Sequence, residues 1–394
     1  MAGFVLAVRS GAQTVNLPIV VPLHFTQITG GTYKLGIYAG MGTGATPALF
    51  ELDTGATGFY VTYSPNPGVS PWWGSDVTSL NTPVDTSYAS GLHYTGTLVE
   101  APITLFASSD PSSARLTTPV LKVGQMDSIV DEKTNTVIWN TSGSPSGDPP
   151  VNGAFYGDLG MGLTFNPNGI INLLAQLNYG RGVTPGFRIH ANPQTQKAFL
   201  QIGLTRKDTA NHSAIYLPMN PDTAAGNNTT PTGLRYFSQQ IFNATIHITD
   251  HKGNRSLRSP GVGMLTDTGA TTTLHNTQNS PQPLPTKYAG FIAWDNSDQN
   301  VGNLKDKLTF ELSAPTTSGR TARFFKFKTT SVVNAGNVNV QNNTPDKTDY
   351  YLNTGLSLFL AYDMIYNLKT GEVGLLAVPR HRKGKGWKDK GRWD

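Results

Sequence analysis

Short apolar runs separated by turn residues follow one another along most of the chain. Runs such as ALFEL (residues 48–52) and GFYV (residues 58–61) are bounded by residues such as Gly, Pro, Asn and Ser. Runs of this length with such boundaries are typical of β-strands. The sequence therefore predicts a mostly β protein, with longer loops over residues 140–153, 220–233 and 334–348.

One segment has helical periodicity instead, IINLLAQLNY at residues 170–179. Asn168 is placed to cap its start and Gly180 to end it. We therefore expect one strong helix here and a shorter, weaker one near residues 359–364. The apolar face of the stronger helix would consist of Ile170, Leu173, Leu174 and Leu177.

The pentapeptide DTGAT occurs twice, at residues 53–57 and 267–271. Each copy follows one apolar run and leads into another, so each is predicted to be a turn at the end of a strand. A glycine-containing apolar segment follows each copy about a hundred residues later, DLGMGL at 158–163 and GLSLFL at 355–360. Self-similarity of this kind predicts one unit duplicated.

The length of 394 residues suits two lobes, which we place at residues 1–187 and 188–379. The absence of cysteine excludes disulfides, thiolate metal sites and a cysteine nucleophile. The formal net charge of +5 comes entirely from residues 380–394, where seven Lys or Arg face two Asp. That segment is predicted to be a basic disordered tail, and the nearly neutral remainder gives no reason to expect a nucleic-acid partner.

The sequence alone leaves two alternatives for the cellular compartment of the protein. No apolar run approaches the ~20 residues of a membrane helix, and the first residues do not form a convincing signal peptide. A secreted or periplasmic location is favoured if an export signal has been removed, and a cytoplasmic location is the alternative. We expect a monomer without a membrane span.

Asp53 and Asp267, which open the two repeats, are the candidate catalytic pair. Two carboxyl groups a few Å apart cannot both ionise, so they share one proton and supply both a base and an acid. Such a pair can activate water for peptide hydrolysis without a metal or cofactor, and we predict neither. The glycines that let backbone N–H groups face these carboxylates are Gly55 and Gly269. The hydroxyls that tie the two turns together are those of Thr54 and Thr268.

These residues resemble the pepsin family of aspartic peptidases, and the resemblance covers roughly residues 31–379. It implies a bilobal acid-protease fold, with two homologous β-barrel-like lobes and an active-site cleft between them. It also implies a β-hairpin flap over the substrate, and YASGLHYTG at residues 88–96 is the candidate. Tyr88 would be the flap tyrosine, with Tyr94 as its rival, and an ordinary cross-strand aromatic pair is the structural alternative.

Other roles follow from the same resemblance. Tyr60 occupies the position of a tryptophan that usually binds the flap tyrosine, and it supplies a hydroxyl instead. Trp72 and Trp73 either line a subsite or pack in the core. The residues expected to contact substrate are Tyr88, Ser90, Gly91, Gly55, Gly269, Ala270 and Thr271.

The sequence departs from the family in the two catalytic turns and in the two elements that buttress them. Both repeats read DTGA, as in retroviral peptidases, so Ala56 and Ala270 lack the hydroxyls that usually stabilise the charged carboxylates. We expect raised apparent pKa values for the pair and an optimum less acid than that of pepsin. The elements that buttress the catalytic turns contain polar residues where apolar ones are usual, in Asp158-Leu159-Gly160 and Asn353-Thr354-Gly355.

The resemblance implies an aspartic endopeptidase that cleaves polypeptides between hydrophobic residues and is open to pepstatin-type inhibitors. One alternative is an inactive pepsin-fold binding or inhibitor protein. Another is an unrelated all-β protein, glycan-binding or capsid-like, in which DTGAT is a repeated turn and the two aspartates need not approach. His247 and His251 have no third ligand in sequence, so no metal site is predicted there.

Overall fold

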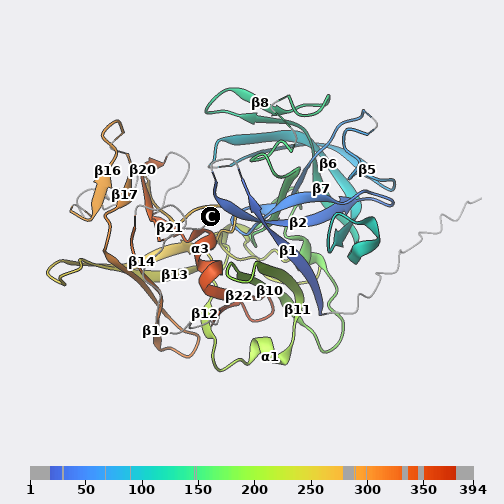
Figure 1. Cartoon of the computed structure of the whole chain (residues 1–394). Coiled ribbons are helices and arrows are strands. Elements are labelled where there is room, and N and C mark those ends of the chain that lie inside the picture. The colour runs from blue at the N-terminus through green and yellow to red at the C-terminus, as the bar shows by residue number, and fades with distance from the viewer. Residues whose placement is uncertain are drawn as a thin grey trace, which may run out of the picture.

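The computed structural model describes residues 18–28, 31–66, 68–88, 90–145, 147, 149–277, 288, 290–298, 300–330, 336–344 and 350–378. The predicted basic tail lies outside this range. Over the described residues the chain is mostly β, as the sequence predicted, and forms two sheets (Figure 1). None of the helices among the described residues is long and apolar enough to cross a membrane.

The larger sheet has fourteen strands among the described residues. Their spatial order is β12 (Ile215–Pro218), β23 (Glu372–Ala377), β22 (Tyr362–Asn367), β10 (Thr184–Asn192), β11 (Lys197–Leu204), β1 (Ile19–Gln27), β2 (Tyr33–Met41), β3 (Ala48–Asp53), β9 (Gly157–Met161), β4 (Thr57–Thr62), β7 (Ala114–Asp131), β6 (Leu92–Phe106) and β5 (Thr78–Ser87). β8 (Thr136–Trp139) pairs with β7, and β2 also pairs with β6. The boundary expected between residues 187 and 188 falls inside β10.

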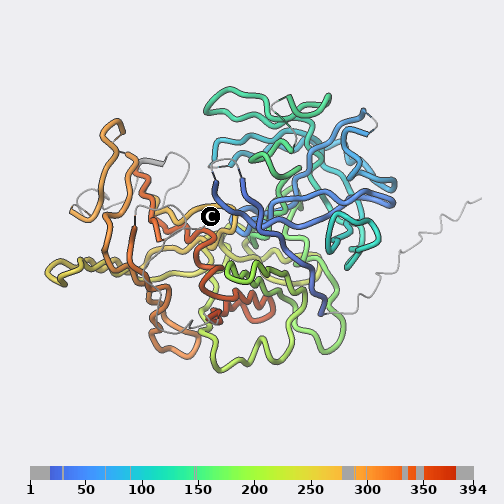
Figure 2. Tube along the Cα trace, viewed as in Figure 1, coloured from blue at the N-terminus to red at the C-terminus, as the bar shows by residue number. Residues whose placement is uncertain are grey.

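The smaller sheet has nine strands among the described residues. Their order is β16 (Ile292–Trp294), β17 (Val301–Leu304), β20 (Asn339–Thr344), β15 (Thr273–Thr277), β21 (Tyr351–Asn353), β14 (Ser256–Leu265), β13 (Phe242–Thr249), β18 (Thr309–Pro315) and β19 (Thr321–Lys328). The helices are α1 (Arg206–Thr209), α3 (Gly355–Ala361) and 3₁₀ turns at Pro111–Ser113, Leu173–Gln176 and Thr223–Ala225. In Figure 2 the orange segments of this sheet lie on the side of the molecule opposite the blue and cyan strands.

The same strand pattern occurs once in each sheet. β3 runs parallel to β9, which is antiparallel to β4, which in turn is parallel to β7. Likewise β14 runs parallel to β21, which is antiparallel to β15, which is parallel to β20. Each DTGAT turn connects equivalent strands, β3 to β4 and β14 to β15. The duplication read from the sequence is therefore repeated in the pairing of the strands.

Two local predictions are wrong. Residues 170–179 contain only the 3₁₀ turn Leu173–Gln176, capped by Asn172 rather than Asn168. Ile171 and Ala175 are buried as well as the predicted apolar face, so tertiary packing surrounds the segment and overrides its helical periodicity. The loop expected at residues 334–348 contains β20, whose Val340 is fully buried and pairs with β15. The weaker helix exists but begins earlier, as α3.

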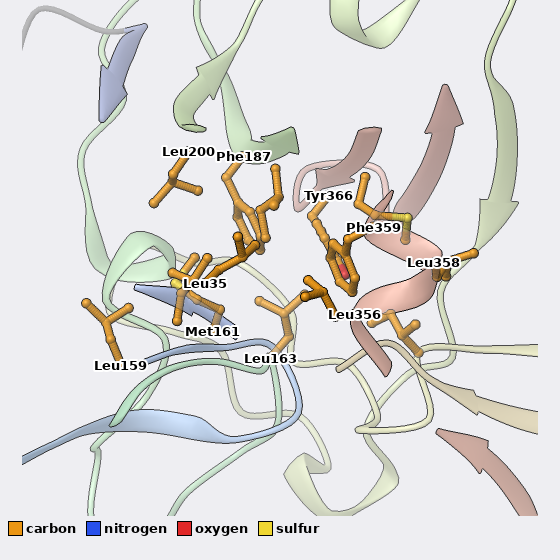
Figure 3. Close-up of a cluster of buried hydrophobic side chains, with 14 of the residues drawn as sticks. Leu35, Leu159, Met161, Leu163, Phe187, Leu200, Leu356, Leu358, Phe359 and Tyr366 are labelled. Carbon is orange, nitrogen blue, oxygen red and sulfur yellow. The ribbon is translucent and has the colours of Figure 1, made fainter. Parts of the chain in front are cut away.

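The hydrophobic core extends to the second DTGAT turn. Figure 3 shows side chains from β2, β9, β10, β11, α3 and β22 converging in one cluster. Within it Phe187 stacks on Tyr366, with ring centroids 4.6 Å apart. The Tyr366 hydroxyl lies 2.9 Å from the Thr266 hydroxyl, immediately before Asp267. The core thus anchors the second DTGAT turn directly.

Candidate active site

Both aspartates stand where a buried strand ends. Asp53 is the last residue of β3, and Asp267 comes two residues after the end of β14. Leu52, just before Asp53, and Leu265, the last residue of β14, are both buried. β3 is held in parallel register by β9, and β14 by β21. Because register fixes which side chain emerges at a strand end, the two carboxyl groups are placed by the sheets rather than by flexible loops.

Each aspartate packs against the glycine of the opposite turn. A Cβ atom at Gly269 would lie 2.7 Å from the carboxyl carbon of Asp53, and one at Gly55 would overlap the carboxyl of Asp267. Real Cβ atoms do not approach so closely, so only glycine fits at either position. The proximity of the Asp267 carboxyl group is one of the causes that raise the pKa of Asp53. The structure therefore brings together two carboxyl groups separated by 214 positions in the sequence.

Thr54 and Thr268 join the two turns through reciprocal hydrogen bonds. The Thr54 N–H donates to the Thr268 hydroxyl oxygen at 3.1 Å, and the Thr268 N–H donates to the Thr54 hydroxyl oxygen at 3.0 Å. The Thr54 hydroxyl donates onward to the Thr266 carbonyl at 2.8 Å, and the Thr268 hydroxyl donates to the Leu52 carbonyl. Both threonines are buried, and the N–H and hydroxyl groups of each are hydrogen-bonded, which fixes the separation of the two aspartates.

Backbone N–H groups face both carboxylates, as the glycines led us to expect. Gly55 N–H donates to Asp53 Oδ1 at 2.6 Å, and Gly269 N–H donates to Asp267 Oδ1 at 2.7 Å. Ala56 N–H adds a longer bond of 3.3 Å to Asp53 Oδ1. Donors of this kind stabilise a carboxylate without any side-chain hydroxyl.

Asn353 is a site residue that the sequence flagged only as polar in an apolar position. Its amide Nδ2 donates to Asp267 Oδ2 at 2.6 Å. Its Oδ1 accepts from Gly355 N–H at 2.9 Å, which orients the amide. Asn353 therefore supplies to the second oxygen of Asp267 the kind of bond that a hydroxyl at Ala270 would have given.

The environment raises the pKa of Asp53 well above the usual range for an aspartate. Burial is the largest cause, and the negative charges of Asp267, Asp158 and Glu51 add to it. This agrees in direction with the expectation drawn from the missing hydroxyls. The main physical cause is nevertheless burial among other acids.

The hairpin of β5 and β6 carries the predicted flap residues. Gly91 N–H donates to the Tyr88 carbonyl at 2.8 Å in the connecting turn, where Ser90 is exposed. The Tyr88 and Tyr94 rings lie 5.0 Å apart, so the aromatic pair considered as an alternative is present. Burial and then the charge of Asp158 raise the pKa of Tyr88 well above its usual value. The Tyr88 hydroxyl thus faces Asp158.

Tyr60 has a partner that the sequence did not single out. Its hydroxyl accepts from Asn166 Nδ2 at 3.5 Å, and the Thr86 hydroxyl of β5 has a lowering influence on its pKa. Burial, followed by the charge of Asp158, raises the pKa of Tyr60 to about 12. Tyr60 is therefore a neutral hydrogen-bonding residue at any pH of interest.

The remaining candidates have structural contacts. The Ala270 carbonyl accepts from Leu356 N–H at 3.0 Å, and the Thr271 hydroxyl accepts from Asn339 at 2.9 Å. Both indoles of Trp72 and Trp73 donate to the Thr62 carbonyl at 2.8 Å, so they brace the end of β4. No group of three potential metal-ligating side chains occurs among the described residues.

Comparison with models of known protein families gave no match, and comparison with curated proteins gave none either.

Proposed function

We propose that the chain is an aspartic endopeptidase with the two-lobed, pepsin-like architecture that its sequence resembles. The observation that carries this proposal is the mutual packing of Asp53 and Asp267, each against the glycine of the other's turn. A repeated turn in an unrelated β protein gives no reason for the two copies to meet. Two buried carboxyl groups in contact hold one proton between them, which is the state that acid–base hydrolysis requires.

In the proposed reaction the pair holds a water molecule between the two carboxyl groups. The ionised carboxylate accepts a proton from this water as its oxygen attacks the scissile carbonyl carbon. The protonated carboxyl donates a hydrogen bond to the carbonyl oxygen as negative charge develops there. Proton transfer to the amide nitrogen then releases the amine and the new carboxylic acid. The crossing of Thr54 and Thr268 keeps the two carboxyl groups in the geometry that each step needs.

The substrate is proposed to be an extended polypeptide covered by the β5–β6 hairpin. Extended peptides bind such sites through backbone hydrogen bonds, and apolar side chains then select between sequences. The half-buried ring of Tyr88 at the hairpin turn supplies apolar surface, which supports a preference for hydrophobic residues beside the cleaved bond. Pepstatin-type inhibitors are expected to compete for the same site.

The test is cleavage of a denatured protein mixture between pH 2 and pH 8, with and without pepstatin. Asp53→Asn and Asp267→Asn should each lower the rate by about 10²–10⁴-fold, since each removes one partner of the acid–base pair. Asp127→Asn, a half-buried position on β7, is the matched control and should retain full activity. Persistence of cleavage in either active-site variant, or no cleavage by the unmodified protein at any pH, would refute the proposal. The second outcome favours a binding protein.

A further inference from the structure

A second pair of buried acids lies beside the catalytic pair, one on β3 and one on the neighbouring strand β9. Glu51 precedes Asp53 by two residues in β3, so their side chains leave the strand on the same face. Asp158 of β9 is in direct register with Glu51. Both side chains are almost fully buried, at 4% and 5% exposed. β3 and β9 therefore carry two buried acids, Glu51 and Asp158, in addition to the two aspartates of the proposed catalytic pair.

A lysine pairs with this acid cluster. Lys34 Nζ of β2 lies 2.5 Å from Glu51 Oε1, and the Asn152 amide donates to Glu51 Oε2 at 3.1 Å. The same Glu51 Oε1 lies 2.7 Å from where a Cβ atom would stand on Gly269. The ion pair therefore reaches across to the second catalytic turn and touches it at the glycine that packs against Asp53.

Lys34 interacts with the catalytic pair as well as with Glu51. Burial lowers the pKa of Lys34, but the charges of Glu51, Asp53 and Asp267 together raise it overall. Coulomb interactions are mutual, so the ammonium group that these carboxylates stabilise also favours their ionised forms. The opposing influence on Asp53 comes from burial and from the acids around it.

Titratable groups face the cluster from every neighbouring element. They are Lys34 from β2, Glu51 and Asp53 from β3, Tyr60 from β4, Tyr88 from the hairpin turn, Tyr94 from β6, Asp158 from β9, Asp267 from the second turn, Tyr351 from β21 and Tyr366 from β22. Within this set Lys34 is the single base. Burial raises the pKa of each of the tyrosines, so they stay neutral and the charge balance rests on Lys34 and the acids.

We propose that Lys34, held in place by Glu51, is a positioning residue that keeps one negative charge on the Asp53–Asp267 pair despite the surrounding buried acids. Without its ammonium group the pair would bind a second proton at a higher pH and lose the base that activates water. The inference rests on the proposed peptidase function, because it assigns Lys34 a part in maintaining the active protonation state. It explains why a charged ion pair is retained beside the catalytic turns.

The decisive measurement is the dependence of kcat/KM on pH. Lys34→Met should shift the acid limb of the profile upward by about one to three pH units, the usual effect of losing a neighbouring opposite charge. Lys34→Arg keeps the charge and should shift it by much less. Lys197→Met, on the exposed start of β11, is the matched control and should leave the profile unchanged. A Lys34→Met profile that falls uniformly, with the acid limb unmoved, would overturn the inference.

Glu51→Gln guards against a variant that simply folds poorly. It keeps an amide oxygen that can accept from Lys34 but removes a negative charge that raises the pKa of Asp53, so the acid limb should move downward, opposite to Lys34→Met. General damage to the fold cannot move the acid limb of one variant upward and that of the other variant downward. Shifts of the same sign in both variants would overturn the inference.

A readout independent of catalysis separates this inference from the proposed function. Buried acids with raised pKa values stabilise the fold while protonated, and that stability is lost as the pH rises through their folded-state pKa values. Losing the Lys34 charge raises these values further, so Lys34→Met should lower the melting temperature more at pH 7 than at pH 4. An equal loss at both pH values would overturn the charge role of Lys34. Activity that survives in Asp53→Asn would refute the peptidase proposal while leaving this thermal test intact.

Discussion

Replacing Thr268 with valine tests whether the crossing of the two turns holds the site together. The Thr268 side chain is fully buried, and its hydroxyl both accepts from Thr54 N–H and donates to the Leu52 carbonyl. Valine has nearly the same shape, so it leaves two buried backbone groups unpaired without opening a cavity. Each such group costs about 1–3 kcal/mol, which gives an expected loss of about 2–6 kcal/mol in the free energy of unfolding.

Thr268→Ser is the matched control, because it keeps the hydroxyl and removes one methyl group at a cost of about 1 kcal/mol. Urea unfolding followed by both tryptophan fluorescence and far-ultraviolet circular dichroism measures the difference and reveals any intermediate. The cleavage rate should fall about 10²-fold in the valine variant, since small displacements of catalytic groups are that costly. Equal stability of the valine and serine variants would show that the crossing does not hold the turns.

Three further predictions concern the groups around the pair. Gly269→Ala should lower kcat/KM by at least about 100-fold because its Cβ would collide with Asp53, and an unchanged kcat/KM would contradict the close packing of that aspartate against the glycine. Asn353→Ala removes a hydrogen bond to an Asp267 oxygen, so the acid limb of the pH–rate profile should rise by about one unit, and an unmoved limb would contradict this. Burial and the charge of Glu51 raise the pKa of Asp158, so Asp158→Asn should gain melting temperature relative to the unmodified protein as the pH rises from 4 to 8. A constant difference in melting temperature would exclude that titration.

The approach of Asp53 and Asp267 to each other could be predicted from sequence because its signal is local and repeated. An identical pentapeptide between apolar runs predicts the same turn at the end of the same kind of strand twice. Asn353 and Lys34 were not accessible in this way, because their partners lie 86 and 17 positions away and only folding brings them together. The single local sign of such a site residue was a polar side chain among apolar neighbours, such as Glu51 within ALFEL.

The errors in secondary structure have a related cause. Periodicity identifies one buried face, but residues 170–177 are buried on nearly every side, so the pattern fits a helix that the surrounding core does not allow. The residues of β20 are rich in Asn, which disfavours strands, yet they pair in parallel with β15 and complete the repeated pattern. In both segments, contacts distant in sequence outweighed local preference.

The two repeats differ at the position that matters most for the charge of the pair. Asp158 pairs in register with Glu51 in the first repeat, and Asn353 pairs in register with Leu265 in the second. Asp158 and Asn353 are therefore structural equivalents. In the second repeat the neutral amide donates to an aspartate oxygen, while in the first two acids surround the other aspartate. A symmetric pair would have no preferred site for its shared proton. Acids around Asp53 and a donor at Asp267 favour the proton on the Asp53 side, and Lys34 then prevents the cluster from taking up a second one.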